Sequence, residues 1–261
     1  MKVISIINLK GGVGKTFTAF NMAYELKKRG YKVLVFDNDK QGNVSKAFGC
    51  YEVAGVSPAA IALNGDYAIT WHLLKQTQYT NVDVVPSNMQ LMQEIYRLAQ
   101  SNENQIERYK RFISTPVGNA GSIAIKDYYD YMIIDNPPDI ALNVVNALSI
   151  TDEVIVPVKI DEWSLEGLEI IAEQIEEAKA IKPDIKLLGA LITMYKNDDA
   201  NIAGLEWLEQ RSPVKLLAKI RYTDKAVEST FFNKAVYEYS PRCGAAQDYK
   251  KFITEYLERE A

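Results

Sequence analysis

Residues 8–16 read Asn-Leu-Lys-Gly-Gly-Val-Gly-Lys-Thr, and this stretch decides the fold. An apolar run at residues 3–7 precedes it and a stretch with helical periodicity follows it, which predicts a strand, a glycine-rich turn and a helix. The glycines let the backbone curl until successive N–H groups point at one anion, and the helix adds the positive end of its dipole. A plain structural turn is the alternative. The residues predicted to form a phosphate-binding loop are Gly11, Gly12, Val13, Gly14, Lys15 and Thr16.

Three side chains of this stretch are expected to act on a nucleotide. Lys15 would reach the β- and γ-phosphates, both binding them and serving catalysis, and the Thr16 hydroxyl would ligate Mg²⁺. A plain phosphate-binding loop specifies no lysine at the position of Lys10, and the alternative is a solvated loop cation. With Lys10 included, the stretch resembles the deviant Walker A motif of the ParA/MinD family of ATPases. That resemblance implies that Lys10 acts catalytically across a nucleotide-sandwich homodimer, on the partner's phosphates.

Composition and charge exclude several other classes of protein. The chain has 261 residues, 48% of them hydrophobic and 25% charged, which suits one soluble α/β domain spanning residues 1–261. A net charge of −4 means that any nucleic-acid binding must come from a local patch. Cys50 and Cys243 have no metal-site spacing, and a lone histidine, His72, cannot build one. We expect a cytoplasmic protein, because we find no secretory leader and no run of about 20 apolar residues.

Apolar runs alternate with helical patterns along the chain, which predicts a doubly wound, mostly parallel sheet flanked by helices, as in P-loop NTPases. The expected strands are residues 2–8, 32–37, 82–86, 131–135, 153–158, 186–193 and 214–220. Helices are expected at residues 15–29, ended by Gly30, and at residues 165–181, before Pro183. Residues 100–126 are polar and predict a helix followed by a surface loop.

The second expected strand ends in two carboxylates, Asp37 and Asp39, within the sequence Asp-Asn-Asp-Lys-Gln-Gly-Asn at residues 37–43. Ligands of open parallel sheets bind beyond the carboxyl ends of the strands, so these acids are expected beside the phosphate loop. Residues 37–43 resemble the family's switch I, and we call them the switch I segment. The resemblance implies that Asp39 orients or deprotonates the attacking water and that Asp37 holds the magnesium shell through water. A turn with solvated acids is the alternative.

A third acid, Asp135, ends another buried strand and is followed by Asn136, Pro137 and Pro138. This is the Walker B position, whose carboxylate accepts hydrogen bonds from magnesium-bound water. The stretch resembles the family's Asp-x-Pro-Pro switch II, which senses the γ-phosphate, and we call residues 135–138 the switch II segment. Mg²⁺ is therefore expected near Thr16, Asp37 and Asp135.

Two segments near the C-terminus extend the resemblance over nearly the whole chain. Residues 189–195 with Asn201 resemble the family's strand and loop beside the adenine, which implies nucleotide contacts from Met194 and Asn201. Residues 220–229 resemble the segment after the last strand, which implies a contact from Arg221. ATP is the nucleotide that this resemblance implies.

The chain departs from the family pattern at three positions of the site. Phe17 belongs to the nucleotide-binding loop but replaces a threonine that touches the α-phosphate, a loss of about 1 kcal/mol of binding free energy unless another donor replaces it. Thr18 follows it directly. Lys40 and Arg221 stand where the family usually has prolines, which leaves the adenine contacts open.

Basic residues are concentrated late in the chain. Residues 211–261 contain ten basic and seven acidic residues, a net charge of +3, so the other 210 residues carry −7. A cationic face on an acidic protein is typical of sequence-independent DNA binding, although ordinary solvated helix charges are the alternative. The side chains that we expect to contact DNA phosphates are Lys219, Arg221, Lys225 and Arg242.

The leading hypothesis is a ParA-type partition ATPase. By resemblance, ATP would form a homodimer that binds double-stranded DNA non-specifically and associates with the nucleoid. A ParB-like centromere-binding protein would stimulate slow, switch-type hydrolysis and so drive plasmid or chromosome segregation. Because the chain starts at the phosphate-loop strand, we expect no N-terminal helix-turn-helix domain.

Two other functions remain as alternatives. A MinD-like or other cargo-positioning ATPase would need a basic amphipathic C-terminal helix, but residues 248–261 end in acids and predict a helix packed on the core, with no membrane partner. A metabolic P-loop enzyme is the third hypothesis. If it were an iron–sulfur carrier, it would need suitably placed cysteines, and this chain has only Cys50 and Cys243.

Overall fold

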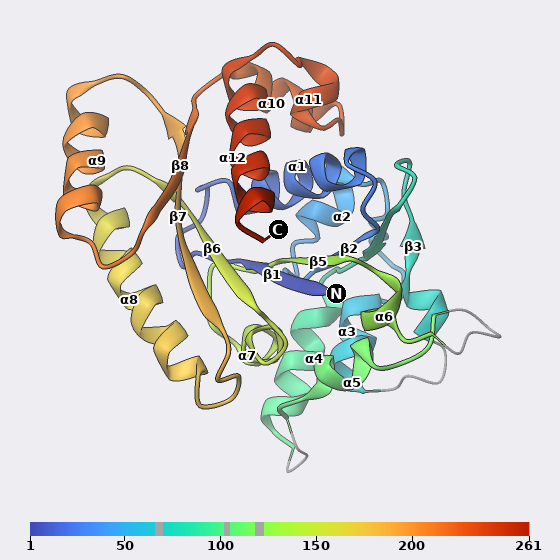
Figure 1. Ribbon diagram of the computed structural model, residues 1–261. Helices are drawn as coiled ribbons and strands as arrows, with labels where there is room; N and C mark the ends of the chain where they lie inside the picture. Colours follow the sequence, from blue (N-terminus) through green and yellow to red (C-terminus); the bar gives the residue numbers. More distant parts are fainter. Residues whose placement is uncertain (66–69, 102–104, 118–122, 261) are drawn as a thin grey trace.

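The computed structural model describes residues 1–65, 70–101, 105–117 and 123–260. Within these ranges, eight strands form one sheet in the order β3-β4-β2-β5-β1-β6-β7-β8 (Figure 1). β3 is antiparallel to β4, and the other neighbouring strands are parallel. The strands are β1 (Lys2–Ile6), β2 (Val33–Asp37), β3 (Lys75–Gln76), β4 (Val82–Val85), β5 (Tyr131–Asp135), β6 (Glu153–Lys159), β7 (Lys186–Tyr195) and β8 (Leu216–Arg221).

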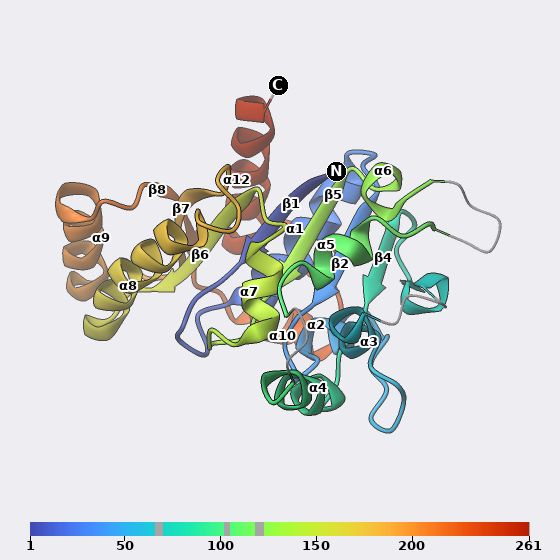
Figure 2. The same cartoon turned by 90° about the horizontal axis from the view of Figure 1, so that it is seen from below.

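Helices cover both faces of the sheet. One face carries α1 (Lys15–Lys28), α2 (Asn43–Ala47), α10 (Asp224–Phe231), α11 (Val236–Tyr239) and α12 (Gly244–Glu260) (Figure 1). The other face carries α3 (Pro58–Asn64), α4 (Gln90–Ala99), α5 (Arg108–Ile113), α6 (Ile125–Tyr128), α7 (Leu142–Leu148), α8 (Glu162–Ala178) and α9 (Asp199–Arg211), and Figure 2 views the molecule from this side. A short 3-10 helix spans Thr70–Leu73.

The strands are apolar along their whole length because both faces are covered. In β2, Val33 and Val35 pack under α1, whereas Leu34 and Phe36 pack against α3 and α5. Successive side chains of a strand point to opposite faces, so one continuous apolar run supplies two separate cores.

The seven predicted strands and the doubly wound class are confirmed, with shifts of one or two residues at several strand ends. β3 was not predicted, because two exposed residues carry no periodic signal. α8 begins three residues earlier than the predicted helix. In the polar region, α4 ends at Ala99 and α5 and α6 follow, while residues 102–104 and 118–122 lie outside the described residues.

The C-terminal helix α12 packs on the sheet as predicted. Tyr249, Phe252, Ile253 and Tyr256 are buried, and the Tyr256 hydroxyl donates a 2.7 Å hydrogen bond to Glu153 at the start of β6. Among the described helices, none has the length and apolar character that crossing a bilayer requires.

Candidate nucleotide-binding site

The phosphate-binding loop leaves β1 and enters α1 at the carboxyl edge of the sheet. Gly12 and Gly14 adopt positive φ angles of 72° and 87°, a region that side chains other than glycine rarely enter. Gly14 caps α1 in this left-handed conformation. Between them Val13 is buried, and its carbonyl accepts a 2.8 Å hydrogen bond from the Thr193 hydroxyl of β7. The loop is therefore held in a curled shape by its glycines and by a strand 180 residues away.

Lys15 is folded back over the loop. Its Nζ donates to the carbonyl oxygens of Asn8 and Lys10, both at 2.9 Å, and the side chain is buried. Burial lowers the pKa of this ammonium group, while the nearby carboxylates of Asp135 and Asp39 oppose that shift. The lysine therefore lies along the loop in a geometry from which it can turn to a bound phosphate.

Asp135 is buried beside the start of α1, and one of its oxygens is paired. The Thr16 hydroxyl donates to Asp135 Oδ2 at 2.7 Å, whereas Asp135 Oδ1 has no hydrogen-bond partner among the described residues. Burial first, and the nearby charge of Asp37 second, raise the pKa of Asp135 well above its usual range. A buried carboxylate oxygen without a donor fits the water shell of a cation, so Thr16 and Asp135 suit magnesium.

The two acids of the switch I segment face different surroundings. Asp37 lies beside Asp135 in the β2–β5 register and is fully buried. Its Oδ2 accepts hydrogen bonds from the Ser45 N–H at 2.9 Å and hydroxyl at 2.5 Å, and burial raises its pKa to about 7. Asp39 instead borders a cavity, where its Oδ1 accepts from the Gln41 N–H at 2.9 Å. Asp39 is therefore placed to meet a ligand directly, and Asp37 is held by protein donors.

This cavity has a volume of about 780 Å³ and contains the predicted site. It is lined by the phosphate loop, the switch I segment and α2. Pro138, the last residue of the switch II segment, and the following Asp139 line it as well. Thr230 of α10 and Asn233 also line it. The volume is that of a site for a small organic ligand.

A smaller apolar cavity of about 200 Å³ adjoins the first, and the two share Gly14, Phe17, Met194 and Thr230. Met194 and Arg221, predicted to contact the nucleotide, both line the smaller cavity. Asn201, also predicted there, lines neither: it lies in the first turn of α9, where its amide donates to Asp198 Oδ1 at 2.7 Å. Eight predicted nucleotide contacts therefore line one or both cavities, namely Gly11, Gly12, Gly14, Lys15, Thr16, Phe17, Met194 and Arg221, whereas Val13 and Asn201 line neither.

Phe17 borders both cavities and packs on Tyr249 of α12, with ring centroids 5.8 Å apart. Thr18 does not stand in for the missing threonine, because its buried hydroxyl shares a 2.8 Å hydrogen bond with the Tyr249 hydroxyl. The departure at this position therefore removes a polar side chain from the cavity and supplies an aromatic wall.

Two lysines at the rim of the loop are in ion pairs. Lys10 Nζ contacts Asp161 Oδ2, which lies between β6 and α8. Lys40 Nζ lies 3.4 Å from Asp139 Oδ2 and so joins the switch I segment to the turn after β5. Asp161 carried no signal in the sequence, because it is 151 positions from its partner.

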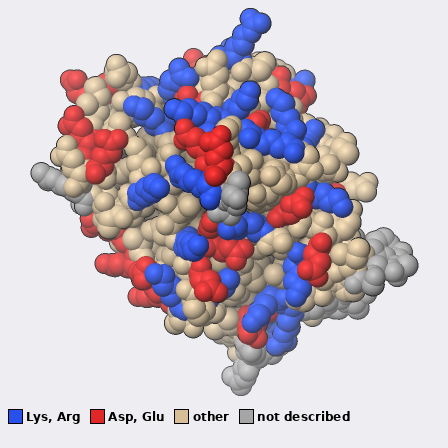
Figure 3. All heavy atoms as spheres, viewed as in Figure 1, with Lys and Arg blue, Asp and Glu red and all other residues tan. Residues whose placement is uncertain are grey.

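The four predicted DNA contacts lie near β8, α10 and α12, but their charges are differently engaged. Arg221 pairs with Asp248 through two 2.8 Å contacts, and Lys225 pairs with Glu228. Lys219 lies over the ring of Tyr195, 4.8 Å from its centroid, and Arg242 is exposed. Figure 3 shows Lys and Arg gathered over the end of the molecule that carries α10 and α12, with Asp and Glu among them.

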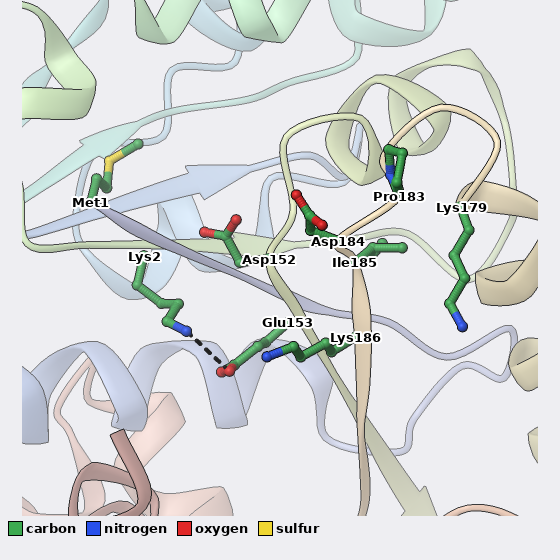
Figure 4. A pocket seen from close by; sticks show the side chains of 9 residues that line it. All are labelled: Met1, Lys2, Asp152, Glu153, Lys179, Pro183, Asp184, Ile185 and Lys186. Carbon is green, nitrogen blue, oxygen red and sulfur yellow. Dashed lines mark hydrogen bonds and ion pairs between the residues drawn. The ribbon is translucent and has the colours of Figure 1, made fainter. Parts of the chain in front are cut away.

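Another cavity, of about 770 Å³, lies at the opposite edge of the sheet, at the amino ends of β1, β6 and β7 (Figure 4). Lys2 and Glu153 form a 3.1 Å ion pair there, and Lys182 pairs with Asp152 nearby. Charges that neutralise one another leave little field for a ligand, so the loop cavity remains the candidate site.

The amino-acid sequence is similar to a known domain family and to proteins of two bacteria. The family described as AAA domain matches residues 1–187. The sporulation initiation inhibitor protein Soj of Bacillus subtilis is 31% identical, over 97% of this chain and 97% of that protein. The chromosome partitioning protein ParA of Caulobacter vibrioides is 28% identical, over 100% and 95%.

Among solved structures, cobyrinic acid a,c-diamide synthase from Mycobacterium smegmatis with bound ATP analog and magnesium is similar, with a TM-score of 0.82. It is 25% identical, and the match covers 100% of this chain and 96% of that one. The overall fold is therefore shared by partition proteins and by a biosynthetic enzyme.

Proposed function

The chain belongs to the ParA/MinD family of P-loop ATPases, and we propose that it is a ParA-type partition ATPase that uses ATP and Mg²⁺. The observation that carries the proposal is one cavity bordered by the phosphate loop, with Lys15 and Thr16, and by Asp39. Partition proteins that match this chain over nearly its full length support the biological assignment.

Different residues at the cavity would bind magnesium, bind the phosphates and orient the attacking water. Magnesium, when bound, would be held by Thr16 and by water on Asp135 Oδ1, and would offset phosphate charge. Lys15 would leave the Asn8 and Lys10 carbonyls to bind the phosphates. Asp39, the acid that faces the cavity, would orient the attacking water.

Lys10 connects the site to a second copy of the chain. In the isolated chain its ammonium group is occupied by Asp161. An ATP-dependent homodimer, in which Lys10 binds the phosphates of the partner subunit, would require this ion pair to break. Asp161 therefore competes with dimerisation.

Replacing Asp161 with asparagine should increase dimer formation at a given ATP concentration. Both side chains are about one-third exposed, and pairs of this kind contribute about 0.2–1 kcal/mol each. Because a symmetric dimer breaks one pair in each subunit, the shift in dimer dissociation constant should be no more than about 30-fold. Light scattering after size-exclusion chromatography with ATP measures it. Asp139→Asn, which breaks the Lys40 pair instead, is the matched control, and an equal shift in both variants would contradict this role of Asp161.

DNA binding would use the surface formed by β8, α10 and α12. Arg221 and Lys225 are already paired with acids, so Lys219 and Arg242 are the better phosphate contacts. Replacing either residue with alanine should weaken binding equally for all DNA sequences, and it should make the binding affinity less dependent on salt concentration.

The experiment that tests the proposal measures binding to random double-stranded DNA with ATP, with ADP and without nucleotide. We expect steeply salt-dependent binding with ATP only, lost in Lys10→Ala and prolonged in Asp39→Ala. Binding that ignores both nucleotide and salt, or its complete absence in a protein that still binds ATP, would overturn the partition assignment.

One observation favours a second function. The likeness to cobyrinic acid a,c-diamide synthase extends over the whole chain, and that protein's structure holds an ATP analog and magnesium. A small-molecule ligase would hydrolyse ATP rapidly only when its acceptor substrate is present, whereas a partition ATPase would respond to DNA and to a ParB-like protein. The MinD-like alternative gains no support from α12, whose apolar side chains are buried.

A further inference from the structure

Asn38 lies between the two acids of the switch I segment and is fully buried. Its amide Nδ2 donates to Asn136 Oδ1 at 2.8 Å and to the Asn143 carbonyl at 3.2 Å. Its Oδ1 accepts a 2.8 Å hydrogen bond from the hydroxyl of Tyr109, in α5. One side chain of the switch I segment is therefore bonded to the switch II segment, to α7 and to α5.

The backbone of Asn38 is bonded to two of the same neighbours, the switch II segment and α7. Its N–H donates to the Asp135 carbonyl at 3.0 Å, and its carbonyl accepts from Asn143 Nδ2 at 2.7 Å. Asn136 is anchored in turn, because its own N–H donates to the Ile6 carbonyl at the end of β1. Three adjacent strand ends are therefore tied together beneath the cavity.

Polar groups in this position need a reason, because apolar side chains would fill the same space without any hydrogen-bond requirement. Asn38, Asn136 and Asn143 are at most 1% exposed, and Tyr109 is fully buried. Such a network specifies one relative placement of its members, which packing alone would leave looser. Here Asn38 belongs to the switch I segment and Asn136 to the switch II segment, and both segments contribute residues that line the cavity.

We propose that the Asn38–Asn136 hydrogen bond couples the two switch segments, so that a displacement of the Pro137–Pro138 turn by bound nucleotide also repositions Asp39. Asn38 and Asn136 are positioning residues, since neither borders the cavity. The exposed Lys40–Asp139 pair spans the same two regions at the surface, and the buried amide pair is the stiffer link. The catalytic part of the proposal rests on the proposed role of Asp39.

The first test is a double-mutant cycle on ATP hydrolysis with Asn38→Ala, Asn136→Ala and the double variant. Each single change should lower kcat about tenfold, the rate equivalent of one buried hydrogen bond, with KM for ATP nearly unchanged. The double variant should be no slower than either single variant, because all three lack the same link. Multiplicative losses, or wild-type kcat in Asn136→Ala, would overturn the coupling.

Tyr109→Phe is the matched control. It removes another hydrogen bond to the same Asn38 side chain and leaves the link to Asn136 intact. It should lower the denaturation midpoint as much as Asn136→Ala does while keeping kcat near that of the wild type. Equal losses of kcat in the two variants would mean that the network is merely structural.

A second readout does not depend on the role of Asp39. In the wild type, a non-hydrolysable ATP analogue should slow amide exchange at residues 38–43 and 136–141 together. In Asn136→Ala the analogue should still slow amide exchange at residues 136–141 but no longer at residues 38–43. Slowed exchange of both segments in this variant would refute the coupling. If Asp39→Ala keeps wild-type kcat while this exchange pattern holds, the proposed role of Asp39 fails and the coupling stands.

Discussion

Lys15→Ala should lose at least about 100-fold in affinity for ATP, because the charge-assisted hydrogen bonds of its ammonium group to the phosphates are lost. Charge-assisted hydrogen bonds contribute about 1.5–3 kcal/mol each, and 1.4 kcal/mol corresponds to a factor of ten in affinity. The substitution also leaves the carbonyls of Asn8 and Lys10 without the donor that now joins them, so the empty loop loses part of its order. Isothermal titration with ATP and magnesium measures the loss.

Lys40→Ala is the control for this prediction. Lys40 borders the same cavity, but it is about one-third exposed and paired with Asp139 at the rim. Its loss should change ATP affinity less than about fivefold, as expected for an exposed charge. Similar affinities in the two variants would mean that the phosphates do not bind where the loop predicts.

Asp39→Ala should lower kcat for ATP hydrolysis by about 100-fold or more while ATP affinity stays equal or rises. General-base and water-orienting groups contribute about 10²–10⁴ in rate. Removing a carboxylate from a cavity that receives phosphates also removes a repulsion, so binding should not suffer. Single-turnover hydrolysis and nucleotide titration on one preparation separate the two quantities.

Asp139→Ala supplies the comparison, since it removes another carboxylate from the lining of the same cavity. Asp139 is more exposed and pairs with Lys40, so hydrolysis should fall by less than a factor of five. A wild-type rate in Asp39→Ala would transfer the water-positioning role to another group.

Much of the site was predictable because its parts are local in sequence. The phosphate loop needs glycines at positive φ, and Gly12 and Gly14 have that conformation. Asp37 and Asp135 were predicted at strand ends, and the β2–β5 register brings them side by side. What was missed are side-chain contacts that depend on the folded geometry: Ser45 binding Asp37 eight positions away, Asp161 binding Lys10, and Tyr109 binding Asn38.

The nucleotide contact of Asn201 stays a prediction, because Asn201 lines neither of the two cavities. Its place after β7 suggested the adenine, but the helix start at α9 uses its amide and backbone N–H to bind Asp198. The N-cap of α9 is Asp198, and spacing along the chain does not reveal that the Asn201 amide and N–H are bound to its side chain.

The sequence by itself determined the phosphate loop, the apolar strands and the acids that end two of them, because backbone conformation and hydrophobic periodicity are properties of consecutive residues. Only the tertiary structure decided which acid faces the cavity, which partner holds Lys10, and how Asn38 ties the two switch segments together. Those outcomes depend on the strand order, which places β2, β5, β1 and β6 side by side and so brings together residues up to 151 positions apart.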